Sequence, residues 1–533
     1  MKTLDAVVVG AGFGGLYALK KLRDDLGLKV LAFDKAAGVG GTWFWNRYPG
    51  AMSDSEAHVY CYSWDDELLE DWKFSTKFIY QPEVLRYLEH VAERYRLYPD
   101  IRLNTAITSA VFDDGSGRWL ISTDDGEQYN AKYFVTALGL LSATNEPVIK
   151  GLEHFTGAVY HTSRWPKDAT VAGKRVGVIG TGSSGVQTIT AIAPVVEHLT
   201  VFQRSAQYTV PSGQRPLADE EVKAIKADYK KIWDDVRNSP LAFGFELSAV
   251  PTHSVCEEER EKIFSRAWDG GGGFRFMFET FSDIGVDLEA NKAAQDFIRR
   301  KIGEIVKNPD TARRLMPTEL HAKRPLCDAG YYETFNRENV SLVCLKTTPI
   351  VEMTPRGIRT ADGTEHELDV VVLATGFEAV DGNLKRLDVR GRGGLRIQDH
   401  WKEGASSYLS LATSRFPNMF MVLGPNGPFC NLPPAIESQV EWIADAIGYM
   451  ERHAVETLEA SEAAEVAWGQ ACQEIAEQTL FARTASWIFG ANSSGKKHTV
   501  YFYMGGLNLF RDKIREVAAS GYPGFDLERS TRG

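Results

Sequence analysis

The stretch LDAVVVGAGFGGLYALKKL, residues 4–22, decides the fold at the start of the chain. A short apolar run, typical of a buried strand, leads into a glycine-rich turn, and leucines at helical spacing follow. Strand, turn and helix in this order predict a dinucleotide-binding unit, in which a pyrophosphate approaches backbone N–H groups at the helix N-terminus. The glycines expected to allow this approach are Gly10, Gly12 and Gly15.

The next apolar strand, VLAF at residues 30–33, ends at Asp34, which lies 24 positions after Gly10 (34 − 10). A carboxylate at this place accepts hydrogen bonds from free ribose hydroxyls and repels a 2′-phosphate. Asp34 therefore predicts FAD as the first dinucleotide. The alternative is a glycine-rich turn followed by a surface aspartate with no ligand.

The same pattern recurs in KRVGVIGTGSSGVQTITAI, residues 174–192. The glycines of this second turn are Gly180, Gly182 and Gly185. Here the following strand ends at Arg204, again 24 positions after the first glycine (204 − 180). A guanidinium suits a 2′-phosphate, so the second unit is predicted to hold NADPH.

Two neighbours of this pattern are candidate secondary contacts. Ser205 is predicted to contact the 2′-phosphate, and Gln187 is predicted to contact the pyrophosphate. Either side chain is equally explained as a polar group that is satisfied within a turn.

The fold class predicted is α/β, with two Rossmann-like dinucleotide-binding domains, for FAD and NADPH, and a helical insertion. Apolar strands ending in small-residue turns recur at residues 133–142 and 368–377. Between the two halves, apolar residues from Val222 to Val236 recur at helical spacing, and Ser254 with Glu257 predicts a capping box. The predicted parts are 1–140 (FAD domain, N-terminal part), 141–216 (linker and first part of the NADPH domain), 217–332 (helical insertion), 333–381 (second part of the NADPH domain) and 382–533 (FAD domain, C-terminal part).

Composition excludes several other classes of function. The chain of 533 residues has a formal net charge of −11, so it lacks the basic field that nucleic acid or anionic lipid requires. The six cysteines form no CxxC and the histidines form no HExxH, which argues against dithiol and metal chemistry. No apolar run approaches ~20 residues and none resembles a signal peptide. A cytoplasmic protein without a membrane partner, monomeric or weakly oligomeric, is expected.

The segment between the two nucleotide units reads FTGAVYHTSRWP, residues 155–166. It fits the pattern F-x-G-x-x-x-H-x-x-x-W-P and resembles the linker of the Baeyer–Villiger monooxygenases, which are class B flavoproteins. Further stretches resemble the cyclohexanone-oxidising branch of that family: GTWFWNRYPGA (41–51), TALGLLSA (136–143), AKRPLCD (322–328), LGPNGPFCNLPP (423–434) and SWIFGAN (486–492). The linker residues are Phe155, Gly157, His161, Trp165 and Pro166, and by resemblance they form an interdomain hinge.

The resemblance implies the reaction. In that family NADPH reduces FAD, the reduced flavin reacts with O2 to give a C4a-peroxyflavin, and this attacks a small cyclic ketone to yield a lactone while NADP+ is retained. The flavin supplies the nucleophile, so no nucleophilic side chain is needed. The protein must stabilise negative charge and exclude water.

The resemblance also implies the residues of the site. Arg324 matches the charged donor that stabilises the oxygen adduct, and Asp54 matches the carboxylate that orients it. Lys323 matches the second ligand of the 2′-phosphate, beside Arg204. Thr42, Trp43 and Trp487 are implied to make further contacts with the cofactors. The ketone pocket is implied to be lined by Leu138, Phe429, Leu432 and Phe502.

Two other functions remain open from the sequence. A class B N- or S-oxygenating monooxygenase uses the same flavin chemistry on soft nucleophiles. A non-catalytic NADPH-binding module would keep both nucleotide folds without consuming NADPH.

Overall fold

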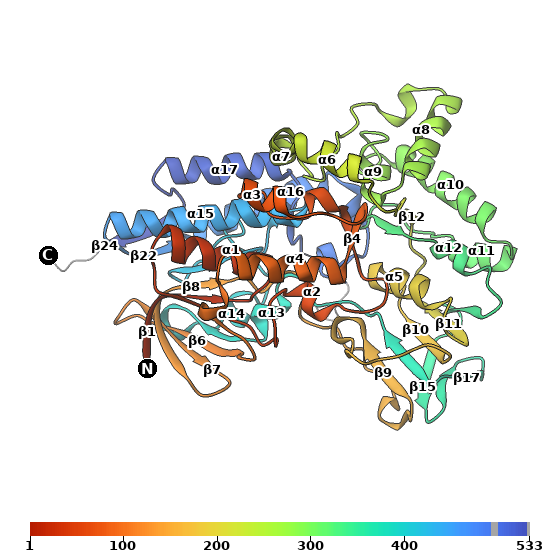
Figure 1. The fold of residues 1–533 in the computed structure, drawn as a ribbon, viewed down its shortest axis with the longest axis horizontal. Coiled ribbons are helices and arrows are strands. Elements are labelled where there is room, and N and C mark those ends of the chain that lie inside the picture. Colours follow the sequence, from red (N-terminus) through yellow and green to blue (C-terminus); the bar gives the residue numbers. More distant parts are fainter. Residues whose placement is uncertain (492–498, 530–533) are drawn as a thin grey trace.

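The computed structural model describes residues 1–491 and 499–529 and contains two sheets with parallel cores (Figure 1). In the first sheet, β1 lies between β8 and β2 and runs parallel to both, with Val7 level with Phe134 and Leu31. The strands of this sheet, in spatial order, are β19 (Asp388–Arg390), β6 (Ile107–Asp113), β7 (Arg118–Thr123), β8 (Gln128–Thr136), β1 (Lys2–Val9), β2 (Val30–Phe33) and β5 (Ile101–Arg102), with β20 (Met419–Met421) also paired to β8.

The second sheet is parallel throughout, and its neighbouring strands β10 and β18 are the near-continuous buried apolar runs that a parallel sheet favours. In spatial order its strands are β14 (Val340–Cys344), β11 (His198–Gln203), β10 (Arg175–Ile179), β18 (Val370–Leu373) and β9 (Ala158–His161).

The remaining strands of the described residues form smaller ladders. They are β3 (Met52–Glu56) with β4 (Phe78–Tyr80), β12 (Thr209–Pro211) with β13 (Leu326–Asp328), β15 (Ile350–Thr354) with β16 (Gly357–Thr360) and β17 (Glu365–Glu367), β21 (Gly427–Pro428) with β23 (Phe502–Tyr503), and β22 (Val455–Ala460) with β24 (Phe525–Arg529).

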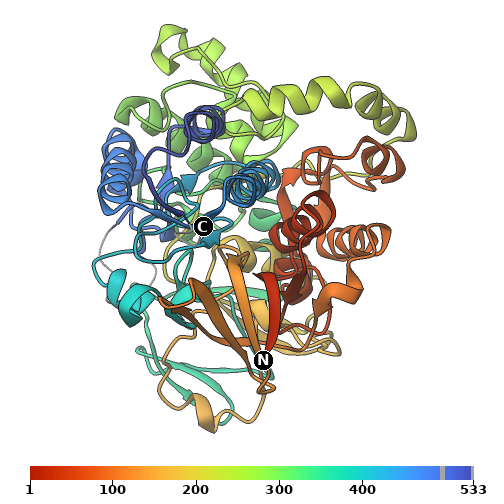
Figure 2. The same cartoon turned by 90° about the vertical axis from the view of Figure 1, so that its left-hand side faces the viewer.

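Helices α1, α15 and α17 pack in succession above the first sheet in Figure 1, whereas α8, α10 and α11 lie at the opposite end of the molecule from β1 (Figures 1 and 2). The helices are α1 (Phe13–Lys20), α2 (Thr42–Trp45), α3 (Asp66–Asp71), α4 (Gln81–Arg94), α5 (Ser183–Ile192), α6 (Asp219–Ala227), α7 (Tyr229–Asn238), α8 (Glu257–Gly270), α9 (Gly273–Phe278), α10 (Leu288–Ile305), α11 (Pro309–Leu315), α12 (Tyr331–Thr334), α13 (Gly382–Lys385), α14 (Ile397–His400), α15 (Leu432–Arg452), α16 (Glu462–Glu477) and α17 (Leu507–Ala519).

The α/β class with two dinucleotide-binding units is confirmed. Strand β20, from the last third of the chain, pairs with β8 of the first sheet, and β14 and β18 join the sheet that begins with β9 and β10. The domain boundaries themselves stay predictions. Within the described residues, no helix combines the length and the hydropathy needed to cross a lipid bilayer.

Two local details of the insertion differ from expectation. The helical pattern from Val222 to Val236 is divided between α6 and α7, because the backbone leaves helical geometry at Asp228. The capping box predicted at Ser254 is wrong: helix α8 is preceded by Cys256, and the Ser254 hydroxyl donates instead to the carbonyl of Pro251. A serine hydroxyl competes for nearby backbone groups outside helices, and here that local bond prevails.

Candidate active site

A cavity of about 1010 Å3 lies between the two nucleotide-binding units. Most of the predicted site residues line it, although they come from segments far apart in the chain. The lining includes Gly10, Gly12, Asp34, Thr42, Trp43, Asp54, Leu138, Gly180, Gly182, Gln187, Arg204, Ser205, Lys323, Arg324, Phe429, Leu432, Trp487 and Phe502. The predicted residues outside the lining are Gly15, Gly185, Phe155, Gly157, His161, Trp165 and Pro166.

The first glycine turn fits a dinucleotide. Gly10 has a φ of +110°, and a Cβ there would lie 2.3 Å from the carbonyl oxygen of Ala137. Gly15 permits close packing of α1 against β1, because its Cβ would fall 1.7 Å from the carbonyl oxygen of Gly10. Gly12 precedes the first residue of α1 and lines the cavity, so the helix N-terminus is open to a phosphate.

Asp34 stands directly after β2, where a ribose ligand is expected. Its two carboxylate oxygens accept hydrogen bonds from the backbone N–H groups of Ala11 and Ala36, both at 2.8 Å. Burial raises the pKa of Asp34, and the two N–H donors act in the opposite direction. Each oxygen keeps a further lone pair that can accept from a ribose hydroxyl, so the side chain fits FAD.

The second glycine turn has the same geometry. Gly180 has a φ of +108°, and a Cβ there would lie 2.4 Å from the carbonyl oxygen of Ala374. No described atom comes within 4 Å of a Cβ built on Gly182, so this side of the turn faces open space. The hydroxyl-bearing residues Ser183 and Ser184 begin α5 and line the same space, and the sequence analysis missed them. The turn therefore fits a second pyrophosphate.

Cations gather where a 2′-phosphate is predicted. Arg204 follows β11 directly and is exposed, and in the described part of the chain no carboxylate forms an ion pair with it. Lys323 also lines the cavity, but its ammonium is paired with the carboxylate of Glu319. Two cations on one wall fit NADPH better than NADH.

The Gln187 side chain lines the cavity, but its amide group is already hydrogen-bonded within the protein. Its amide oxygen accepts from the hydroxyl of Tyr48 at 2.7 Å, and its amide nitrogen donates to the carbonyl of Met52 at 3.0 Å. The side chain thus joins α5 of the second unit to residues 48–52 of the first. Only its remaining hydrogen-bonding capacity is available for a pyrophosphate, and that contact stays a prediction.

Arg324 and Asp54 form an ion pair in the wall of the cavity, although they are 270 positions apart. The Asp54 side chain is 5% exposed and the Arg324 side chain is 30% exposed. Burial by itself lowers the pKa of Arg324, but the Asp54 carboxylate more than offsets this, so the pKa lies above its ordinary value. The cavity therefore holds a permanent positive charge, oriented by a carboxylate on β3.

Aromatic side chains surround this charge. The guanidinium of Arg324 lies 5.5 Å from the ring centre of Phe274, which stacks on Phe243 at 4.1 Å. Phe429 contacts Phe274 and Phe502, with ring centres 6.4 and 5.7 Å apart. Phe243 and Phe274 could not be singled out from the sequence, because phenylalanines in phenylalanine-rich stretches such as these usually serve core packing.

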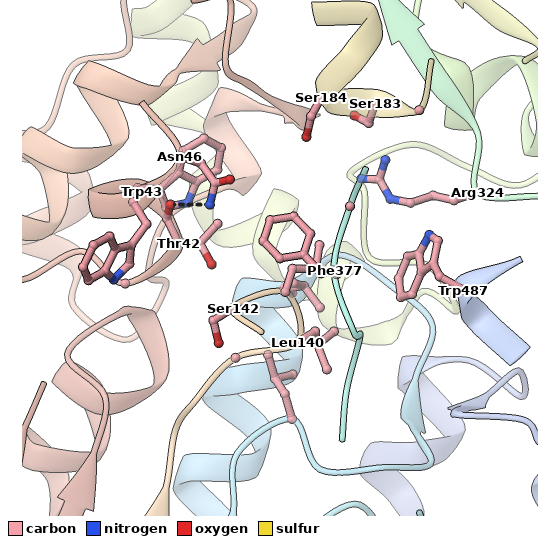
Figure 3. A pocket seen from close by; sticks show the side chains of 18 of the residues that line it. Thr42, Trp43, Asn46, Leu140, Ser142, Ser183, Ser184, Arg324, Phe377 and Trp487 are labelled. Atoms are coloured by element: carbon pink, nitrogen blue, oxygen red, sulfur yellow. Dashed lines mark hydrogen bonds between the residues drawn. The ribbon is translucent and has the colours of Figure 1, made fainter. Parts of the chain in front are cut away.

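Figure 3 shows Arg324 and Trp487 on the same side of the cavity, with Thr42 on the opposite side and Ser183 and Ser184 at another edge. Trp487 begins a short 3-10 turn, and its ring packs edge-on against Phe502 at 5.5 Å. The last residue of the SWIFGAN stretch, at position 492, lies outside the described residues. A nicotinamide contact by Trp487 stays a prediction.

The linker residues lie beside the cavity, where the chain crosses between the units. His161 ends β9; its Nδ1 accepts from the backbone N–H of Ser163 at 3.1 Å, and its Nε2 lies 3.2 Å from the hydroxyl of Thr375. That hydroxyl donates to the carbonyl of Asn145 at 2.7 Å, so it accepts from His161. Burial lowers the pKa of His161, which agrees with the neutral ring that this network requires.

The rest of the linker is packed against the second unit. A Cβ on Gly157 would lie 2.4 Å from the carbonyl oxygen of Asp369, and Trp165 is buried against Tyr160 at 5.3 Å. Phe155 joins the apolar cluster around Ile179, whereas Pro166 is exposed. None of these linker residues lines the cavity, and the hinge role predicted for them stays a prediction.

Comparison with known proteins places the chain in a family. Residues 4–212 match the model of the flavin-binding monooxygenase-like family. Cyclohexanone 1,2-monooxygenase of Acinetobacter sp. is 56% identical over 98% of this chain and 96% of its own length. Phenazine N-monooxygenase PhzNO1 of Lysobacter antibioticus is 54% identical over 98% and 97%, and a Baeyer-Villiger monooxygenase of Pseudooceanicola batsensis is 53% identical over 99% and 96%.

A solved structure agrees with these relatives. The crystal structure of cyclohexanone monooxygenase from Rhodococcus sp. Phi1 bound to NADP+ superposes with a TM-score of 0.99 at 57% identity, covering 99% of this chain and all of the other. The similarity extends over both nucleotide-binding units, the linker and the insertion. On this evidence the chain belongs to the Baeyer–Villiger monooxygenase family.

Proposed function

We propose that this protein is an NADPH- and FAD-dependent Baeyer–Villiger monooxygenase that converts small cyclic ketones such as cyclohexanone into lactones, consuming O2. The single observation that carries the proposal is the Arg324–Asp54 ion pair in a cavity lined by both glycine turns. The relatives named for cyclohexanone oxidation, which align over nearly the whole chain, support it.

The two turns would hold the cofactors. FAD would lie on the first turn with its ribose at Asp34, and NADPH on the second with its 2′-phosphate at Arg204 and Lys323. Flavin reduced by NADPH would supply activated oxygen for insertion beside the carbonyl. The remaining tasks, which are binding, orientation, water exclusion and charge stabilisation, fall to side chains of this chain.

Arg324 is suited to stabilising negative charge on oxygen. Its guanidinium stays protonated at any working pH, so it donates hydrogen bonds without giving up a proton. Asp54 fixes its orientation through their ion pair. The rings of Phe274, Phe429 and Phe502 keep the surroundings apolar, which strengthens the electrostatic effect and leaves space for an apolar ketone.

The proposal is tested with the FAD-loaded enzyme, NADPH and cyclohexanone in oxygenated buffer. We expect NADPH consumption to rise when the ketone is added, with one lactone formed per NADPH consumed, measured by gas chromatography. NADPH oxidation that yields hydrogen peroxide alone, with every cyclic ketone tried, would refute the proposal.

A second candidate is N- or S-oxygenation, and the 54% identity to a phenazine N-monooxygenase favours considering it. The same assay with methyl phenyl sulfide and with a phenazine separates the two. Sulfoxide or N-oxide formed without any lactone would select the second candidate. Nucleotide binding without substrate-dependent NADPH consumption would indicate a binding module instead.

Arg204→Ala is expected to raise the KM for NADPH about 10- to 100-fold, because a charge-assisted contact to the 2′-phosphate is lost. The KM for NADH, which lacks this phosphate, should change little, and this provides a control within the same variant. Steady-state kinetics with both coenzymes measure the effect. If the ratio of the KM for NADPH to the KM for NADH were the same in the variant as in the unmodified enzyme, Arg204 would not bind the 2′-phosphate and the assignment of NADPH to the second glycine turn would be wrong.

A further inference from the structure

One carboxylate beside the predicted 2′-phosphate site has no part in the function proposed above. Glu319 lies in the loop between α11 and β13, four residues before Lys323, and forms an ion pair with its ammonium. The ammonium of Lys346, which follows β14, lies 3.9 Å from the same carboxylate. The backbone carbonyl of Glu319 accepts from the hydroxyl of Tyr208 at 2.9 Å, which holds this loop near the end of β11.

The carboxylate is charged at neutral pH. Burial raises the pKa of Glu319, but Lys323, Lys346 and Arg204 together lower it below its ordinary value. Lys323 and Arg204 line the cavity, whereas Glu319 does not, so Glu319 acts on a bound ligand through Lys323. In this structure, the lysine predicted to bind a phosphate is already occupied by an anion of the protein itself.

We propose that Glu319 is an internal anion that competes with the 2′-phosphate of the coenzyme for Lys323, and thereby limits how tightly NADP(H) is held. The inference rests on the proposed function, because it requires the second glycine turn to bind a 2′-phosphorylated dinucleotide. Glu319 is a positioning residue in this role, since it acts through the lysine.

The direction of the effect follows from electrostatics. A lysine ammonium is a compact charge with three N–H donors, and the Glu319 carboxylate takes one of its contacts. A 2′-phosphate carrying nearly two negative charges must share or displace that contact, and it is also repelled by the carboxylate. Removing the charge of Glu319 would leave Arg204, Lys323 and Lys346 uncompensated, which strengthens their attraction for the phosphate.

The test measures the binding of 2′,5′-ADP and 5′-AMP, which differ only in the 2′-phosphate, to the FAD-loaded enzyme. Glu319→Gln keeps the shape of the side chain and removes its charge. We expect this variant to bind 2′,5′-ADP about five-fold more tightly, with the dissociation constant for 5′-AMP unchanged, as measured by isothermal titration calorimetry. Glu338→Gln, which removes an exposed carboxylate outside the cavity lining, should leave both dissociation constants unchanged.

A second pair of variants tests the route through the lysine. In a Lys323→Met background, adding Glu319→Gln should change the dissociation constant for 2′,5′-ADP by less than about two-fold, because the lysine that the carboxylate and the phosphate share is gone. A gain that persists in this background would overturn the inference.

Failure of the inference is distinguishable from failure of the proposed function. If the unmodified enzyme binds 5′-AMP as tightly as 2′,5′-ADP, the NADPH site itself is wrong. If it prefers 2′,5′-ADP but Glu319→Gln binds it equally or more weakly, only the competition by Glu319 is overturned, and the carboxylate then holds Lys323 in place for the phosphate.

Discussion

Arg324→Ala is expected to lower lactone formation about 10²- to 10³-fold while FAD and NADPH still bind, because one preorganised charged donor is lost from the reaction site. NADPH oxidation should continue, with hydrogen peroxide released in place of lactone. Coupling, the ratio of lactone formed to NADPH consumed, measures this effect separately from cofactor binding. Normal lactone yield in this variant would remove Arg324 from the mechanism.

The design must separate lost chemistry from lost stability. Asp54 is nearly buried, so Arg324→Ala leaves an unpaired carboxylate in the cavity, at a cost of about 3–5 kcal/mol. The double variant Arg324→Met, Asp54→Asn removes both charges and avoids this penalty. Its lactone yield should nevertheless be no higher than that of Arg324→Ala. Arg266→Ala, at an exposed arginine outside the cavity lining, is the matched control and should retain full coupling.

Gly12→Val is expected to abolish FAD binding, so that the purified protein is colourless. A Cβ on Gly12 would lie 3.3 Å from the Cα of Gly41, a tight contact that a backbone shift of a few tenths of an ångström would relieve. The two methyl groups beyond this Cβ would occupy the space at the N-terminus of α1, where the pyrophosphate of FAD is predicted to lie. Flavin absorbance per protein after gel filtration measures the loss.

Gly469→Val is the matched control, because it makes the same change inside α16, where no described atom lies within 4 Å of an added Cβ. That variant should keep its flavin and its colour. Circular dichroism of both variants shows whether each is folded. A folded, yellow Gly12→Val protein would show that the first glycine turn does not bind FAD.

Both glycine turns were predictable from the sequence because their geometry is local. Each turn follows a strand and opens a helix within about fifteen residues, so order along the chain is enough to define it. Asp34 and Arg204 were found for the same reason, since each stands immediately after a strand. The helix expected across Val222 to Val236 was less accurate, because periodicity does not register the break at Asp228.

Other parts of the site carry no local pattern. Phe243 and Phe274 resemble ordinary core residues in sequence, and only their stacking beside Arg324 shows that they border the cavity. Gln187 was expected to face a phosphate, yet its amide joins the two nucleotide-binding units. The pairing of Lys323 with Glu319 was equally invisible, because a lysine near a glutamate in sequence is usually a solvated surface pair.

The order of residues over short stretches of the chain was sufficient to predict the two nucleotide-binding turns, the opposite charges of Asp34 and Arg204, and the α/β class. Neighbouring residues set the backbone geometry of the turns and the ends of the strands. Family resemblance added Arg324 and Asp54 and the expectation that the carboxylate orients the guanidinium. Their contact joins positions separated by 270 residues, and so it depends on the tertiary packing that places β3 beside β13. The geometry of this ion pair, its apolar surroundings and the competing carboxylate beside Lys323 are therefore properties of the folded molecule alone.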